Sequence, residues 1–222
     1  MDFAQQLVNG VQIGSVYALV AIGYTMVYGI AKMINFAHGD IIMVGSYVAL
    51  LFFQSSGLPV WGVIAATAAV SAVQGVTIER LAYKPLRGGS RMSALITTIG
   101  VSLMLQNGFL LIFGSSPKPF PNHFTGEGFT LGGVTVSRLT AITLVVTVVL
   151  MVLLTLFVNR TRVGKAMRAV SEDQGAAQLM GINIDTSISI TFAIGSALAA
   201  VAAVLYSSTY PLINPYMGSM LG

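Results

Sequence analysis

The stretch LTAITLVVTVVLMVLLTLFV, residues 139–158, contains no charged side chain, no glycine and no proline. A helix needs about 20 predominantly apolar residues to cross the hydrocarbon core of a membrane, and this stretch has that length. Strands of a membrane β-barrel are shorter and alternate between apolar and polar residues, which this stretch does not do. Residues 139–158 therefore predict a transmembrane helix.

Uncharged runs of comparable length recur along the chain. Charged residues are absent from residues 3–31, 41–78, 92–117, 139–159 and 186–222, and the second run is long enough to cross a membrane twice. Of the 222 residues, 55% are hydrophobic and only 8% are charged, whereas a soluble domain carries about 25% charged residues. The composition predicts an all-α, polytopic transmembrane helix bundle that forms one domain over residues 1–222.

We expect six hydrophobic elements followed by a seventh, polar-broken piece. The predicted bounds are residues 5–30, 36–53, 60–78, 93–113, 139–158 and 187–207, with the last piece at 210–222. The turn SSGLP at 55–59 separates the second element from the third, because glycine and proline break helices. Gly195, Ala199 and Ala203 recur at four-residue spacing, which indicates either static close packing or a sliding permease interior. No convincing internal repeat is evident, since the recurring Ile-Gly pairs are short.

The basic residues indicate an orientation in the membrane. Residues 79–91 and 159–170 are rich in lysine and arginine, whereas the longer connection 114–138 has only Lys118 and Arg138. Basic residues concentrate in the cytoplasmic loops of membrane proteins. We therefore expect both basic connections in the cytoplasm, and an external amino terminus if every element crosses.

The connection 159–185 contains a predicted short helix at residues 172–180. Ser171 and Gln174 have the spacing of a capping box, and Glu172 and Asp173 fall in the first turn, where negative charge favours the helix dipole. Gly181 stands where a left-handed carboxyl-terminal cap is expected. The apolar side of this helix has little bulk and consists of Ala176, Ala177, Leu179 and Met180.

Two interpretations of this helix remain open. As a docking element, it would fit a shallow groove on a partner protein and pass force to the spans on either side. Alternatively, it lies on the membrane surface, where lipid phosphates attract the four basic side chains of residues 159–170.

The stretch KMINFAHGDIIMVG, residues 32–45, places polar side chains between two apolar runs. One interpretation puts His38 and Asp40 near the cytoplasmic face, with Asp40 capping the second helix through the amides of Ile42 or Met43. The alternative is that Asn35, His38 and Asp40 line the translocation path, since non-helical backbone at membrane depth needs protein or water to satisfy it. A catalytic dyad is disfavoured, because no serine nucleophile accompanies the pair.

Three further residues with amide side chains also allow either a structural interpretation or a place on the translocation path. Gln106 and Asn107 interrupt the fourth element, where buried amides either bond between helices or contact a passing zwitterionic amino acid. Asn214 precedes Pro215, which disfavours continuous helix and suggests a broken helix beside the path or a simple terminating turn.

Composition also narrows the class of function. The chain has no cysteine and only two histidines, so we expect neither a thiolate metal site nor another cofactor, and no catalytic residues. The net charge of +4 is better explained by membrane topology than by nucleic acid binding. RVGKAM, at 162–167, has the Gly-Lys pair but not the rest of a phosphate-binding loop, so we expect ATP hydrolysis to occur in a partner. An ion-coupled secondary transporter is the alternative, with Asp40 as its candidate carboxylate near the early spans.

Five stretches, taken in order, resemble the branched-chain amino-acid permeases of bacterial ABC transporters. They are NGVQIGSVYALVAIGYTMVYGI, MINFAHGDIIMVGSYV, IERLAYKPLR, RAVSEDQGAAQLMGIN and INPYMG. Among them, INFAHGD and AAQLMGIN are the most specific. Members of this family usually continue past INPYMG with further spans, so the resemblance implies that the carboxyl-terminal spans are lacking here.

The resemblance implies a division of labour in the bacterial inner membrane. A periplasmic solute-binding protein captures the amino acid, two related but distinct permease subunits form the path through the lipid, and two cytoplasmic ATP-binding subunits drive the cycle. In this family the region matching 164–184 contacts the ATPases, which favours the docking interpretation of Ser171, Glu172, Asp173, Ala176, Ala177, Leu179 and Gly181.

Overall fold

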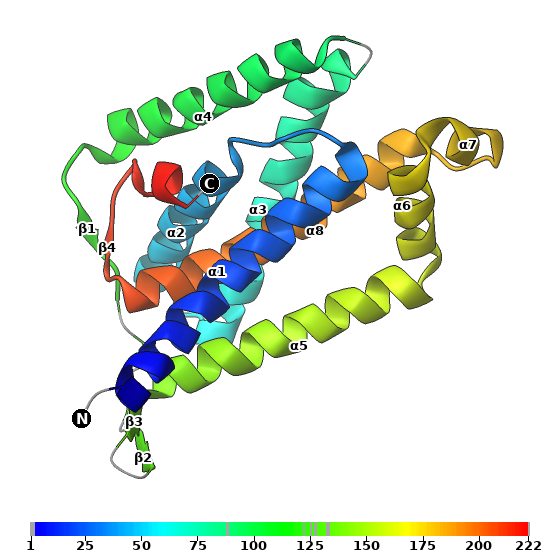
Figure 1. The fold of residues 1–222 in the computed structure, drawn as a ribbon. Coiled ribbons are helices and arrows are strands. Elements are labelled where there is room, and N and C mark those ends of the chain that lie inside the picture. Colours follow the sequence, from blue (N-terminus) through cyan, green and yellow to red (C-terminus); the bar gives the residue numbers. More distant parts are fainter. Residues whose placement is uncertain are drawn as a thin grey trace.

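The computed structural model describes residues 3–87, 89–121, 123–124, 126, 128–131 and 134–221. Within them, five helical segments are long and apolar enough to cross a membrane (Figure 1). They are α1 (Phe3–Ala31), α3 (Val60–Ile78) with its extension to Leu86, α4 (Arg91–Phe113), α5 (Arg138–Arg160) and α8 (Ile184–Thr209). The predicted all-α bundle is confirmed, and each of these segments contains one of the predicted hydrophobic elements.

Helix α8 forms the centre of the bundle. It packs against α1, α3 and α2 (His38–Ser55). Of the residues in its most apolar 18-residue stretch, 67% are buried, against 11% in the corresponding stretches of α4 and α5. A Cβ on Gly195 would lie 2.8 Å from Val27 on α1, and Ala199 and Ala203 are fully buried. The small-residue stripe therefore packs neighbouring helices closely, as small residues do in membrane bundles.

Helix α2 begins inside the bundle. The His38 ring lies 3.3 Å from the position that a Cβ on Gly23 would take, about 12 Å before the end of α1 at a rise of 1.5 Å per residue. The preceding residues 32–37 are not helical and carry the chain back from the end of α1 (Figure 1). The expectation that His38 and Asp40 lie near one end of the bundle is therefore wrong.

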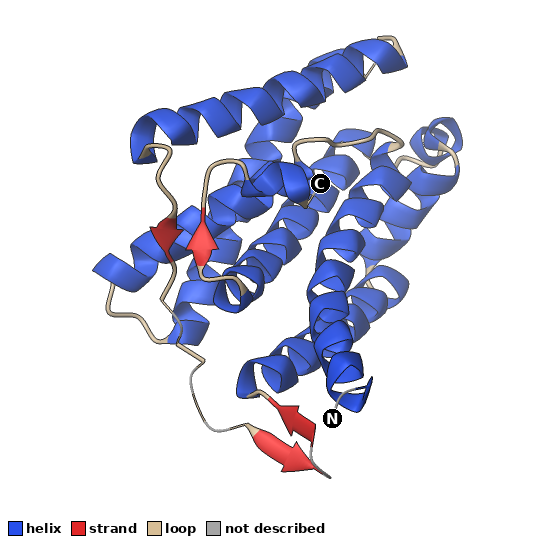
Figure 2. Ribbon diagram, turned by 60° about the vertical axis from the view of Figure 1, so that its left-hand side comes forward, coloured by secondary structure: helices blue, strands red, loops and turns tan. Residues whose placement is uncertain are grey.

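The last described residues also turn back into the bundle. After α8, strand β4 (Leu212–Ile213) pairs antiparallel with β1 (Lys118–Pro119), and the 3-10 helix η3 (Met217–Met220) packs on α2 (Figure 2). A second strand pair, β2 (Phe129–Leu131) with β3 (Val134–Val136), lies near the amino terminus. The non-helical backbone predicted around Asn214 and Pro215 is confirmed.

The two basic connections lie at one end of the bundle, which we call the basic end. Helix α3 continues there through η1, a π-helical turn (Glu79–Tyr83), and η2, a 3-10 turn (Lys84–Leu86). Lys84 forms an ion pair at 2.8 Å with Asp185 at the start of α8. We call the other end, where β1 and β4 lie, the opposite end.

The connection between α5 and α8 contains two helices instead of one. Helix α6 (Arg162–Glu172) buries Gly164, Met167 and Val170, and α7 (Gln174–Leu179) follows it directly. The predicted Ser171 cap is wrong, because Ser171 lies within α6 and donates to the Arg168 carbonyl at 2.7 Å.

Asp173 caps α7 instead of Ser171. Its backbone is extended, and its carboxylate accepts from the Ala176 amide at 3.0 Å, as an N-cap does. The predicted cap at Gly181 is confirmed, since Gly181 has φ of 79° and its amide donates to the Gln178 carbonyl at 3.0 Å. The Ile182 amide donates to the Ala177 carbonyl, which completes a Schellman motif.

Candidate functional site

An asparagine turn shapes the segment that leads into α2. Asn35 Oδ1 accepts from the Ala37 amide at 3.0 Å and from the Tyr83 hydroxyl at 2.6 Å. The Asn35 carbonyl accepts from the His38 amide at 3.1 Å. Asn35 is 1% exposed, so this turn fixes the segment to η1 from within the bundle.

A second asparagine turn, near the carboxyl end of the chain, has the same two hydrogen bonds within the turn. Asn214 Oδ1 accepts from the Tyr216 amide at 2.9 Å, and its carbonyl accepts from the Met217 amide at 3.2 Å. The sequences of the two turns correspond, INFAHG at 34–39 and INPYMG at 213–218. We call them the first and second asparagine turns; this repeated motif went unrecognised in the sequence because it is short.

The two turns meet at Asp40. A Cβ built on Gly218 would lie 2.7 Å from Asp40 Oδ1 and 2.7 Å from the Gly39 carbonyl oxygen. Gln106 Nε2 on α4 donates to Asp40 Oδ1 at 2.9 Å and also contacts Ser102 Oγ at 3.1 Å. Asp40 and Gln106, 1% and 8% exposed, are the predicted path residues that the structure brings into direct contact.

The other predicted path residues occupy different positions. Asp40 does not cap α2, whose N-cap residue is Ala37 with no side-chain hydrogen bond. His38 packs edge-on to Tyr24 of α1 with ring centroids 5.7 Å apart. Asn107 is exposed and donates to the Leu103 carbonyl of its own helix at 2.8 Å, so it does not join Asp40 and Gln106.

A charged cluster at the basic end was missed in the sequence. Glu79 is fully buried and accepts from Ser189 Oγ at 2.6 Å. Arg87 bridges it to Asp185, with one guanidinium nitrogen on each carboxylate. The signal that could have revealed the cluster is Glu79 itself, the only acidic residue in the basic connection 79–91.

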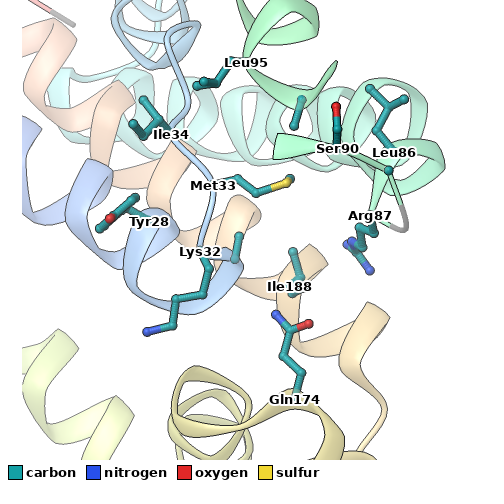
Figure 3. A pocket seen from close by; sticks show the side chains of 13 residues that line it. Tyr28, Lys32, Met33, Ile34, Leu86, Arg87, Ser90, Leu95, Gln174 and Ile188 are labelled. Carbon is teal, nitrogen blue, oxygen red and sulfur yellow. The ribbon is translucent and has the colours of Figure 1, made fainter. Parts of the chain in front are cut away.

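A cavity of about 460 Å³ opens at the basic end. Residues 32–34, which lead into the first asparagine turn, form one wall, and Arg87 and Ser90 contribute to another (Figure 3). Gln174, the first residue of α7, points into the cavity toward Ile188 (Figure 3). The cavity thus lies between α7 and the segment that enters the bundle.

The acidic and histidine side chains do not gather into a metal site in the described part of the chain. No group of three or more histidine, aspartate or glutamate residues is close enough together there to hold an ion. Inside the bundle, the buried Asp40 carboxylate and the Gln106 amide offer a charge and hydrogen-bonding groups.

Comparison with known proteins places the chain in a transport family. Residues 6–222 match the family described as the permease component of branched-chain amino acid transport systems. The chain is 46% identical, over 99% of its length, to the high-affinity branched-chain amino acid transport system permease protein BraD of Pseudomonas aeruginosa, and 44% identical over the same share to LivH of Escherichia coli K12. It covers 76% and 75% of those two proteins.

A more distant relative and the solved structures complete this comparison. A probable branched-chain amino acid transport permease of Methanocaldococcus jannaschii is 31% identical over 84% of the chain, which covers 61% of that protein. No solved structure matches the chain. The match over residues 6–222 and the identities to BraD and LivH show that the chain belongs to the family of branched-chain amino acid transport permeases.

Proposed function

We propose that the chain is a permease subunit of an ATP-driven importer of branched-chain amino acids. The observation that carries this proposal is its 46% identity, over 99% of its length, to a permease of a high-affinity branched-chain amino acid transport system. The proposed assembly contains a second, related permease subunit, two cytoplasmic ATP-binding subunits and a periplasmic solute-binding protein. The basic end faces the cytoplasm, in keeping with the distribution of lysine and arginine.

The tip of α7 is the proposed contact with the ATP-binding subunits. Leu179 and Met180 are 90% and 82% exposed, and exposed apolar side chains of this size favour a protein partner. Ala177 is 3% exposed and packs inward, so it supports the tip without forming it. The exposed basic residues of α6, Arg162, Lys165 and Arg168, suit lipid phosphates beside this contact.

A chain of contacts supports a route from α7 to the proposed path. Asp185, shortly after α7, binds Arg87, and Arg87 binds Glu79 at the start of η1. The last residue of η1, Tyr83, holds Asn35 in the first asparagine turn. Movement of α7 would therefore act on a turn that leads directly to Asp40.

The proposed path runs past the meeting point of the two asparagine turns. Asn35, His38, Asp40, Gln106 and Asn214 lie on it or shape it. Asn35 Nδ2 and His38 Nε2 are buried without a hydrogen-bond partner among the described residues. Buried polar atoms are usually satisfied, so these two favour a region that water or solute enters during the cycle.

Reconstitution tests the proposed function. We expect proteoliposomes with the chain, its partner permease and the ATP-binding subunits to take up radiolabelled leucine when loaded binding protein and ATP are present on their respective sides. Omitting ATP should abolish uptake. Uptake by the chain alone, without ATP-binding subunits, would contradict the proposal.

The docking assignment has its own test in Leu179→Asp. A charge at the apolar tip should reduce leucine uptake at least about tenfold, since burying an unpaired charge in an interface is strongly unfavourable. Leu179→Met is the matched control, because it keeps the tip apolar. Normal ATP-driven uptake by Leu179→Asp would remove α7 from the interface.

Ion-coupled secondary transport is the second candidate. It is favoured by the position of Asp40, a carboxylate inside the bundle that forms no ion pair within the described residues. Carboxylates at such depth commonly carry protons in transporters. Uptake by the chain alone under a proton gradient, abolished in Asp40→Asn, would favour this candidate.

A further inference from the structure

Helices α2 and α4 contact each other through a group of polar side chains and, further along, through a group of aromatic side chains. We call this interface between the two helices the seam. Asp40 and Gln106 form the polar end, with the hydrogen bond of 2.9 Å between them. Gln106 Nε2 also donates to Ser102 Oγ, one turn earlier on α4, at 3.1 Å. The ion pairs within the described residues use Glu79 and Asp185, and none involves Asp40.

A buried carboxylate without a cation is costly unless a partner arrives. Taking an ionised carboxylate out of water is strongly unfavourable, and an amide donor offsets only part of that cost. An ionisable residue at membrane depth therefore indicates a cationic partner during function. The α-ammonium group of an amino acid is such a cation.

The other end of the seam is aromatic. Tyr47 packs against Phe113 and Phe109 of α4, with ring centroids 4.5 Å and 5.3 Å apart. Tyr47 is fully buried and its hydroxyl has no hydrogen-bond partner among the described residues. Asp40 precedes Tyr47, and Gln106 precedes Phe113, by about two helical turns or 10 Å on each helix. The polar and aromatic contacts therefore follow one another along the same pair of helices.

Helix α4 is a wall that can move without unpacking the core. Only 11% of the residues in its most apolar 18-residue stretch are buried, and the helix lies at the edge of the bundle (Figure 1). Ile96, Leu103 and Leu111 are 63%, 54% and 87% exposed. Few buried contacts mean that local displacement of α4 costs little compared with displacement of α8.

We propose that the seam between α2 and α4 receives the transported amino acid. Asp40 and the Gln106 side-chain oxygen accept hydrogen bonds from the α-ammonium group, and Tyr47, Phe109 and Phe113 surround the aliphatic side chain. In this structure the Gln106 amide bonds to the carboxylate in place of the ammonium group, so the seam is closed. The site takes zwitterionic amino acids with apolar side chains, and it rests on the proposed function.

Photolabelling of the assembled transporter locates this site directly. The probe is photo-leucine, a leucine analogue with a diazirine in its side chain, added with binding protein to membranes that contain the whole complex. We expect labelled peptides from α2 around Tyr47 or from α4 around Phe109, and excess leucine should remove the label. Label confined to other helices would overturn the proposal.

Variants then separate this site from the proposed function. Asp40→Asn keeps the shape of the side chain, and we expect it to lower both photolabelling and leucine uptake about tenfold or more, the loss typical of a hydrogen bond to a charged group. Asn107→Leu, next to Gln106 but exposed, should behave as wild type. Unchanged labelling and uptake in Asp40→Asn would refute the site while leaving the proposed function intact. Absence of ATP-driven uptake in the wild-type complex would instead refute the proposed function.

Discussion

The two asparagine turns enter the bundle from opposite ends with the same hydrogen bonds, but they are held in place differently. Asn35 is buried and receives a hydrogen bond from Tyr83, far away in the sequence. Asn214 is only partly buried, and its turn is positioned by the β1–β4 pairing and by Gly218 against Asp40. The first turn is thus tied to the charged cluster at the basic end, and the second is tied to the opposite end.

The two turns thus share one motif but are attached to different ends of the bundle. A turn bonded to η1 follows any movement of the basic end, where α7 lies. A turn bonded to a strand pair at the opposite end stays in place unless that end moves. In the proposed transport cycle, the meeting point at Asp40 would open from either side, as alternating access requires.

Gly218→Val should have the largest effect, because it separates the two turns. A side chain at 218 would lie 2.7 Å from the Gly39 carbonyl, a backbone atom. We expect a loss of about 3 kcal/mol in stability, the upper end for overpacking, measured as a lowered thermal midpoint of the purified complex. Gly100→Val is the control, since a Cβ there meets no atom within 4 Å. Equal midpoints for the two variants would contradict the close contact at Asp40.

Asn35→Ala and Asn214→Ala compare the two turns directly. Asn35→Ala leaves the Tyr83 hydroxyl buried without a partner, so we expect a loss of about 2 kcal/mol. Asn214→Ala removes one local bond at a partly exposed site and should cost about 0.5 kcal/mol. Thermal unfolding of both variants, with Asn107→Ala as reference, checks the order. An equal loss would mean that Tyr83 adds nothing to the first turn.

Tyr83→Phe is the mildest change and isolates the tie to the basic end. The ring keeps its packing on Phe192, with centroids 5.1 Å apart, and loses only the hydroxyl. We expect about 1 kcal/mol of destabilisation, together with lower leucine uptake per ATP hydrolysed. Tyr210→Phe, at an exposed tyrosine, is the control. If Tyr83→Phe takes up as much leucine per ATP hydrolysed as the wild type, the route from α7 to the path does not pass through Tyr83.

The sequence predicted the transmembrane elements well, because span length is set by the membrane. The predicted element 60–78 coincides with α3, and 5–30 lies within α1. Helix α6 was not predicted, because among its basic residues and Gly164 the two apolar residues of its buried face, Met167 and Val170, did not form a recognisable helical pattern. Because α6 was not predicted, the cap of the next helix was predicted at Ser171 instead of Asp173.

The depth of Asp40 and the contacts of the site depend on distant partners. Residues 32–37 return into the bundle because Asn35 meets Tyr83, and no local pattern near Asn35 specifies that contact. The charged cluster also joins residues that lie far apart along the chain. The repeated INxxxG pattern was visible in the sequence, and comparing the two stretches as turns would have identified it.

The accessibility of Ser102→Cys tests the central claim, that solute passes the meeting point of the two turns. The chain has no cysteine, so this thiol beside Gln106 is its only one. In the assembled transporter, we expect the cationic thiol reagent MTSET to reach it from the two sides in alternation, depending on whether ATP is bound, and excess leucine to slow the reaction. A Ser102→Cys complex that transports leucine but stays unreactive in every state would contradict the account.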